Sequence, residues 1–152
     1  MLSTTLLQTV LVLAGVSSVT ASPLDLSLEH YEVLAMRAST TVDPNAVTNV
    51  ECTDANVNIV FHDQNVAELG ICGGIAGSIT KCGGAPESTT GESGTALFTL
   101  NAATSGATIN ISKGRWEGCI RAARAVCPTG SISGTCVGGA STGNVDFTLD
   151  NP

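Results

Sequence analysis

The sequence predicts a small α+β domain that is held together by three disulfides. Four short segments alternate apolar and polar residues as strands do, and two segments show the three-and-four spacing of helices. Their order is β-α-β-β-α-β. Each strand has one apolar face, and the right-handed crossover rule puts both helices on the same side. We therefore expect one four-stranded antiparallel or mixed sheet with two helices on one face, the split β-α-β, ferredoxin-like arrangement.

Residues 1–21 have the pattern of a secretory signal peptide. An apolar run extends from Leu6 to Val16, and Val19 and Ala21 have the small-residue spacing that signal peptidase recognises. Cleavage is expected after Ala21. The run covers about ten residues, whereas a membrane span needs roughly 20. The sequence therefore predicts a secreted, extracellular protein with no membrane span.

Residues 22–37 are predicted to be a pro-segment. They hold three acids, one of the two histidines and the only tyrosine, but no cysteine. The segment ends in Leu-Ala-Met-Arg, which resembles the Leu-x-x-Arg sites of fungal Golgi proteases. Cleavage after Arg37 would start the mature protein at Ala38. The alternative is a helical N-terminal arm that stays attached.

The remaining residues, 38–152, have the size of one domain. Removing three of the 13 acids and one of the 6 bases leaves 10 acids and 5 bases, a net charge of −5. Residues 38–50 lack periodicity and contain Pro44, so we expect a flexible arm before a folded domain at 51–152. Only four aromatic residues remain. Because such a core is thin, disulfides worth about 2 to 4 kcal/mol each would supply much of the stability.

The strongest helix prediction covers residues 112–128. Trp116, Cys119 and Ile120 lie on one apolar face, and Pro128 cannot continue the helix. We expect Trp116 to be buried on this face. An earlier helix is expected from Asp63 or Asn65 to about Thr80, although it contains four glycines. The expected strands are residues 56–62, 95–100, 108–112 and 145–150, with loops at 85–94 and 129–143 and a hairpin joining the second and third strands.

All six cysteines are expected to form disulfides, because an even number in a secreted chain is typical of a disulfide framework. Cys119 and Cys127 are too far apart on one helix to bond, and so are Cys72 and Cys82 if the first helix is continuous. With two antiparallel helices, geometry favours the pairs Cys72–Cys127, Cys82–Cys119 and Cys52–Cys136.

The sequence offers little catalytic chemistry. After processing, the one histidine is His62, whose neighbour Asp63 would point to the opposite face of a strand, and no serine has a Gly-x-Ser-x-Gly setting. Two carboxylate pairs are available for glycoside hydrolysis, but such acids are usually solvated surface groups. These pairs are Glu87 with Glu92 and Asp146 with Asp150. We expect no enzymatic activity, metal or cofactor.

Binding to nucleic acid is not expected either, because the charge is negative and no aromatic stacking platform is present. The one concentration of cations is Lys113, Arg115, Arg121 and Arg124, which we interpret as a solvated helix face. The alternative is a contact patch for an acidic surface. Asn110 heads the only glycosylation sequon, Asn-Ile-Ser, and would face away from the helices.

These features together resemble the small cysteine-rich secreted effectors of plant-associated fungi. The features are the signal peptide, a pro-segment ending near Leu-x-x-Arg, an acidic body rich in Gly, Ser and Thr, the even cysteine number and the element order. Within that class, the α/β sandwich is similar to the group named after the killer toxins of smut fungi. Those toxins carry more than the six cysteines found here.

The resemblance implies a non-enzymatic virulence effector that acts outside the cell, in the host apoplast. Its partner would be a protein of a plant host or of a microbial competitor, which the sequence does not name. We expect a monomer. Two alternatives are an antifungal killer-type toxin and a secreted protease inhibitor, for which residues 86–92 or 131–143 would form the inhibitory loop.

Overall fold

A computed structural model describes residues 41–75 and 82–152 of the chain. The predicted signal peptide, the pro-segment, both processing residues (Ala21 and Arg37) and the last part of the predicted first helix lie outside these residues. In chain order the elements are η1 (Pro44–Ala46), β1 (Val47–Asp54), α2 (Phe61–Gly70), η2 (Ile71–Gly73), β2 (Ser88–Ser93), β3 (Ala96–Ala102), α3 (Lys113–Val126), β4 (Ser131–Gly139) and β5 (Asn144–Asp150).

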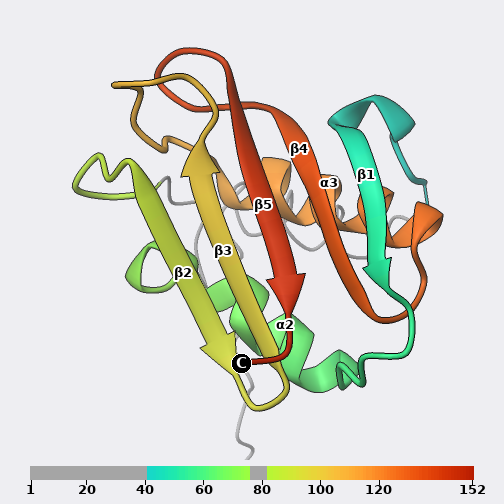
Figure 1. Ribbon diagram of the computed structural model, residues 1–152. Coiled ribbons are helices and arrows are strands. Elements are labelled where there is room, and N and C mark those ends of the chain that lie inside the picture. The colour runs from blue at the N-terminus through green and yellow to red at the C-terminus, as the bar shows by residue number, and fades with distance from the viewer. Residues whose placement is uncertain (1–40, 76–81) are drawn as a thin grey trace, which may run out of the picture.

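The strands form one antiparallel sheet, and both helices cover the same face of it (Figure 1). The sheet has five strands in the order β1-β4-β5-β3-β2, so the predicted number of four was wrong. Helix α2 carries the chain from one edge strand to the other, and α3 connects β3 to β4 past β5. With the helices behind the sheet, β4 lies to the right of β3 and both run upward, so this crossover is left-handed. The handedness rule therefore does not describe it.

Two strands form where the sequence predicted loops. β2 was expected to be part of the loop at 85–94 and β4 part of the loop at 129–143. Their glycines hide the strand pattern, yet each one is needed for packing. A Cβ on Gly91 would lie 2.2 Å from the carbonyl oxygen of Ala67 in α2, and one on Gly134 would lie 2.9 Å from the Phe147 ring. Glycine in these strands marks close approach rather than a break.

Two predicted strands are absent from the described residues, and β1 forms where no strand was predicted. Residues 56–60 form a turn and an irregular stretch before α2, which begins at Phe61. β1 begins at Val47, within the segment predicted as a flexible arm. Residues 108–112 form no continuous strand, although Ile109 makes an isolated bridge to Ala140, so the predicted hairpin was wrong. The alternation that suggested a strand there is still real, since Ile109 and Ile111 are buried and Asn110 is exposed.

Helix α3 confirms the predicted helix and forms the centre of the core. Trp116 is fully buried, as expected, and its ring contacts Phe98 and Phe147 edge to face at centroid distances of 5.1 and 5.7 Å. Alternate residues of β3 and β5 pack beneath it. Such aromatic pairs stabilise beyond the area that they bury. The few aromatic residues are therefore concentrated in one cluster.

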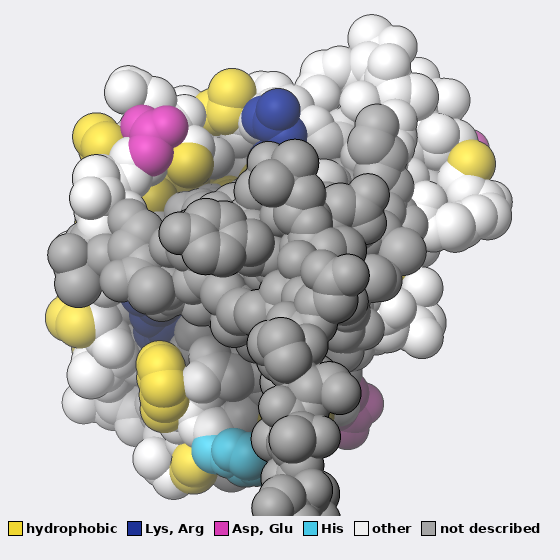
Figure 2. Space-filling model, turned by 180° about the vertical axis from the view of Figure 1, so that it is seen from behind, with side chains coloured by type: hydrophobic (Ala, Val, Ile, Leu, Met, Phe, Trp, Pro, Cys, Tyr) yellow, Lys and Arg dark blue, Asp and Glu magenta, His cyan; other side chains and the backbone are white. Residues whose placement is uncertain are grey.

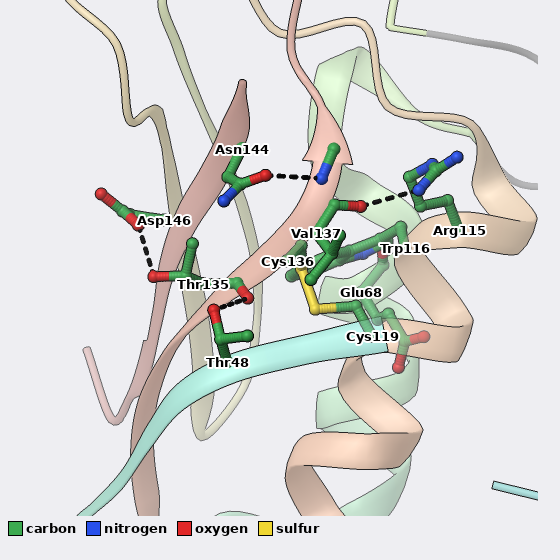
Figure 3. Close-up of a disulfide and its surroundings, with 11 residues drawn as sticks. Thr48, Glu68, Arg115, Trp116, Cys119, Thr135, Cys136, Val137, Asn144 and Asp146 are labelled. Atoms are coloured by element: carbon green, nitrogen blue, oxygen red, sulfur yellow. Dashed lines mark hydrogen bonds between the residues drawn. A yellow bond between two sulfur atoms is a disulfide. The ribbon is translucent and has the colours of Figure 1, made fainter. Parts of the chain in front are cut away.

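All six cysteines form disulfides, but the predicted pairing was wrong. The bonds are Cys52–Cys127, Cys72–Cys82 and Cys119–Cys136. The prediction assumed that cysteines of one helix face those of the other, whereas both cysteines near α3 face strands. Figure 3 shows the bond from α3 to β4, beside a hydrogen bond of 2.7 Å from Arg115 to the Val137 carbonyl.

The Cys72–Cys82 bond forms because the first helix is not continuous. Helix α2 ends at Gly70, and Cys72 has a φ of 58°, outside the helical region. The chain turns there, which brings the Cα atoms of Cys72 and Cys82 to 5.1 Å. The glycines that weakened the helix prediction thus mark its actual end.

A candidate binding groove between the two helices

A hollow with a volume of about 550 Å³ lies between α2 and α3. We call it the interhelical groove. Its walls are one face of each helix, because the contributing positions recur every three or four residues. From α2 it is lined by Phe61, Gln64, Asn65, Glu68 and Leu69, and from α3 by Glu117, Ile120, Arg121 and Arg124.

Two hydrogen bonds join the helices across the base of the groove. The indole nitrogen of Trp116 donates to the Glu68 carbonyl at 2.8 Å, and Nε of Arg124 donates to Oε1 of Gln64 at 2.8 Å. Arg124 also donates to the carbonyl of Gly130 at 2.9 Å. Burial lowers the pKa of the Arg124 guanidinium, which stays protonated because its ordinary value is so high. These bonds link the two helices that form the walls of the groove.

Phe61 stands at one end of the groove with 75% of its surface exposed. It also borders a second hollow of about 400 Å³, formed by the loops at 55–59 and 128–130. Gln64 and Arg124 line both hollows. The two hollows therefore form one continuous surface with Phe61 between them.

The backbone around Phe61 is anchored on both sides, although its side chain is exposed. The Val60 amide donates to Oγ1 of Thr95 at 2.8 Å, and that hydroxyl donates to Oδ2 of Asp63 at 2.9 Å. The Thr95 amide donates to the same carboxylate oxygen at 2.9 Å. The start of α2 is thus tied to the turn between β2 and β3, which presents Phe61 from a rigid support.

The cations of the described residues gather on the helix side, which also carries the acids Glu68 and Glu117. Four of the five cations in residues 38–152 lie on α3, and Figure 2 shows hydrophobic, Lys or Arg, and Asp or Glu side chains on the helix side. Within the groove, Glu117 lies 4.0 Å from Lys113 of the same helix. The open face of the sheet carries exposed acids instead. These are Glu51, Asp54, Glu92, Asp146 and Asp150.

The residues considered for catalysis have other roles or stand apart. His62 is exposed on α2, while the Asp63 carboxylate accepts the bonds from Thr95. Those two bonds hold the pKa of Asp63 below its ordinary value. A carboxylate occupied in this way anchors the turn and does not orient a histidine.

The two carboxylate pairs do not face a common cleft. Glu87 and Glu92 are exposed at or near the edge strand β2, and Asp146 and Asp150 lie four residues apart on β5. A bond from the Ser131 hydroxyl is the main cause that holds the pKa of Asp150 below its ordinary value. Asp146 accepts a bond of 2.7 Å from Oγ1 of Thr135. These acids stabilise the sheet surface.

Three other predictions can be placed on the structure. Asn110 is exposed, so its side chain is accessible, and glycosylation there stays a prediction. Within residues 41–75 and 82–152, no cluster of three or more His, Cys, Asp or Glu side chains could hold a metal ion. In the same part of the chain, no helix is long and apolar enough to cross a membrane.

Comparison with known proteins finds no relative. No protein-family model matches the sequence, and no curated protein or solved structure is significantly similar to the chain. The site therefore has to be interpreted from its own geometry.

Sequence reasoning missed most of the groove. It placed Phe61 on a strand with its ring toward the core, and it assigned no role to Gln64 or Glu68. A usable pattern was present, since Phe61, Asn65 and Leu69 recur every four residues, as on one face of a helix. The glycines that follow obscured where that helix begins and ends.

Proposed function

We propose that this protein is a secreted, non-enzymatic effector that acts outside the cell by binding a protein of a plant host or a microbial competitor. The observation that supports this most directly is Phe61, which is largely exposed at the end of the interhelical groove. An aromatic side chain on a fixed support is typical of the anchor residues that dominate protein interfaces. The disulfides and the predicted signal peptide fit the extracellular setting.

The geometry favours binding of a protein over binding of a small substrate. The groove is open, and its one exposed aromatic ring stands at its end. Arg124 offers a cation beside Phe61, and aromatic residues and arginine are the types enriched where interfaces form. Because the support is already rigid, little conformational entropy would be lost on binding.

The two segments that were proposed as loops of a protease inhibitor lie mostly in strands. Most of residues 86–92 belong to β2, and most of residues 131–143 belong to β4, which is paired on both sides. An inhibitor needs an exposed segment that a protease can engage. The killer-toxin alternative remains a second outcome of the test below.

The experiment is to apply the purified secreted protein to plant leaf tissue, to competitor yeasts and to a panel of proteases. We expect a response of the leaf, seen as cell death or as suppressed immune signalling, without protease inhibition. Growth arrest of yeast would select the toxin alternative, and tight inhibition of a protease would select the inhibitor. A protein inert in all three assays would contradict the proposal.

A further inference from the structure

We propose that the acidic pro-segment, residues 22–37, occupies the interhelical groove before processing, and that cleavage after Arg37 uncovers the groove. This inference rests on the proposed function, in which the groove is the contact surface. It assigns to the segment a role in covering the groove until the chain has been processed in the secretory pathway.

The chain enters the described domain beside the right element. The first described residue is Thr41, and η1, which starts three residues later, packs against α3. Residues 38–40 span at most about 13 Å between Arg37 and Thr41 when extended. The end of the segment is therefore held near the helix that forms one wall of the groove. A helix of 16 residues would measure about 24 Å, comparable with about 21 Å for α3.

The charges favour the helix side over the sheet. Residues 22–37 carry three acids, Asp25, Glu29 and Glu32, against one base, Arg37. The open face of the sheet is acidic and would repel them, whereas the groove presents Arg121 and Arg124. The groove also contains Glu68 and Glu117, and Glu117 lies 4.0 Å from Lys113. These three cations and two acids leave one net positive charge on this side. An acidic segment that is tethered at high local concentration would settle on this side.

The apolar pattern of the segment fits the same surface. In a helical register, Leu24, Leu28 and Tyr31 would share one face, and the three acids would form a stripe beside it. The groove offers Leu69, Ile120 and the ring of Phe61 to such a face. One amphipathic helix would thus meet apolar side chains along the groove and arginines on its rim, which is a known mode of helix recognition.

The test is hydroxyl-radical footprinting of the whole secreted chain, read by mass spectrometry. The parent of the series carries Arg37→Gln so that the segment stays attached, and its intact mass verifies this. We expect labelling of Phe61 and Leu69 to be several-fold slower than in a second chain that also carries Asp25→Lys, Glu29→Lys and Glu32→Lys. Labelling of Val66, which lies on α2 but does not line the groove, should be equal in both chains.

A matched control places the charge reversal on the open sheet face. Glu51 is exposed on that face, and Glu51→Lys should leave the labelling of Phe61 unchanged. Equal labelling of Phe61 in the parent and in the acid-reversed chain would overturn the proposal. Protection that grows with protein concentration would also overturn it, because the occupant would then be a second copy. Footprinting measures accessibility and needs no biological response. A negative footprinting result would therefore contradict the pro-segment proposal without contradicting the proposed function.

Discussion

Trp116 joins the core to the candidate site, since its ring packs on Phe98 and Phe147 while its nitrogen bonds to α2. We expect Trp116→Ala to lower the free energy of unfolding by about 3 to 5 kcal/mol, because it leaves a cavity and removes the hydrogen bond to the Glu68 carbonyl. Val126→Ala is the control, since Val126 is 59% exposed and its truncation should cost at most about 0.5 kcal/mol. Denaturant titration with intact disulfides measures both. Similar midpoints would show that Trp116 is not a core residue.

Asp63 and Asp150 each contribute to the decrease of stability in acid. Both have a folded pKa below the ordinary value of 3.8, so their contribution is complete above that value and is lost as the pH falls through the lower folded pKa. We therefore expect the free energy of unfolding to decrease below about pH 4. Asp63→Asn should flatten this decrease and lower the stability at neutral pH. Denaturant titrations at several pH values decide it, and an unchanged slope in the variant would contradict the assignment.

Asn110 combines a sequon with an exposed position between two buried isoleucines. We expect secreted protein from a eukaryotic host to carry a glycan there, because the side chain is accessible. Treatment with a glycosidase should lower the mass, and Asn110→Gln should have the lower mass from the start. A treated sample of unchanged mass would remove the prediction.

Among the elements, the three disulfides differ in how much chain they close. Cys52–Cys127 joins residues 75 apart, whereas Cys72–Cys82 joins residues 10 apart. In the chain-entropy account, these correspond to about 4.5 and about 2.7 kcal/mol. We expect replacement of Cys52 and Cys127 by Ala to lower the melting temperature more than replacement of Cys72 and Cys82. The reverse order would mean that strain or local packing outweighs loop entropy here.

The elements also show which sequence patterns are informative. α3, β3 and β5 were predictable because their apolar residues repeat with the period of the element and the face they form is buried. β2 and β4 were not, because their inward positions include Gly91 and Gly134, where a neighbouring atom takes the place of a side chain. The periodicity of apolar residues detects only packing by side chains. It does not predict a strand whose backbone packs directly on another element.

At the scale of the whole molecule, the class and the placement of both helices on one face followed from the sequence, while the topology did not. Strand order depends on which edges pair, and no local pattern encodes that β5 inserts between β3 and β4. The disulfide pairing depends in turn on the topology. The groove was missed for a related reason, since it exists only where α2 and α3 come to lie side by side over the sheet.

An exposed side chain does not by itself bind a partner. A matched pair of substitutions on α2 distinguishes exposure from partner binding. Phe61 lines the interhelical groove, whereas Val66 is 45% exposed on the same helix and does not line it. Neither side chain is buried, so Phe61→Ala and Val66→Ala should each change the stability only slightly. Any difference between the two variants in activity then reports contact with a partner.

The most direct test of the account is therefore the leaf response to the secreted protein and to these two variants at equal concentration. The account predicts that Phe61→Ala reduces the response at least tenfold, as loss of an interface anchor does, and that Val66→Ala keeps it. Thermal melts confirm that both variants are folded. A Phe61→Ala protein that is folded and fully active would contradict the central claim that this protein acts through the interhelical groove.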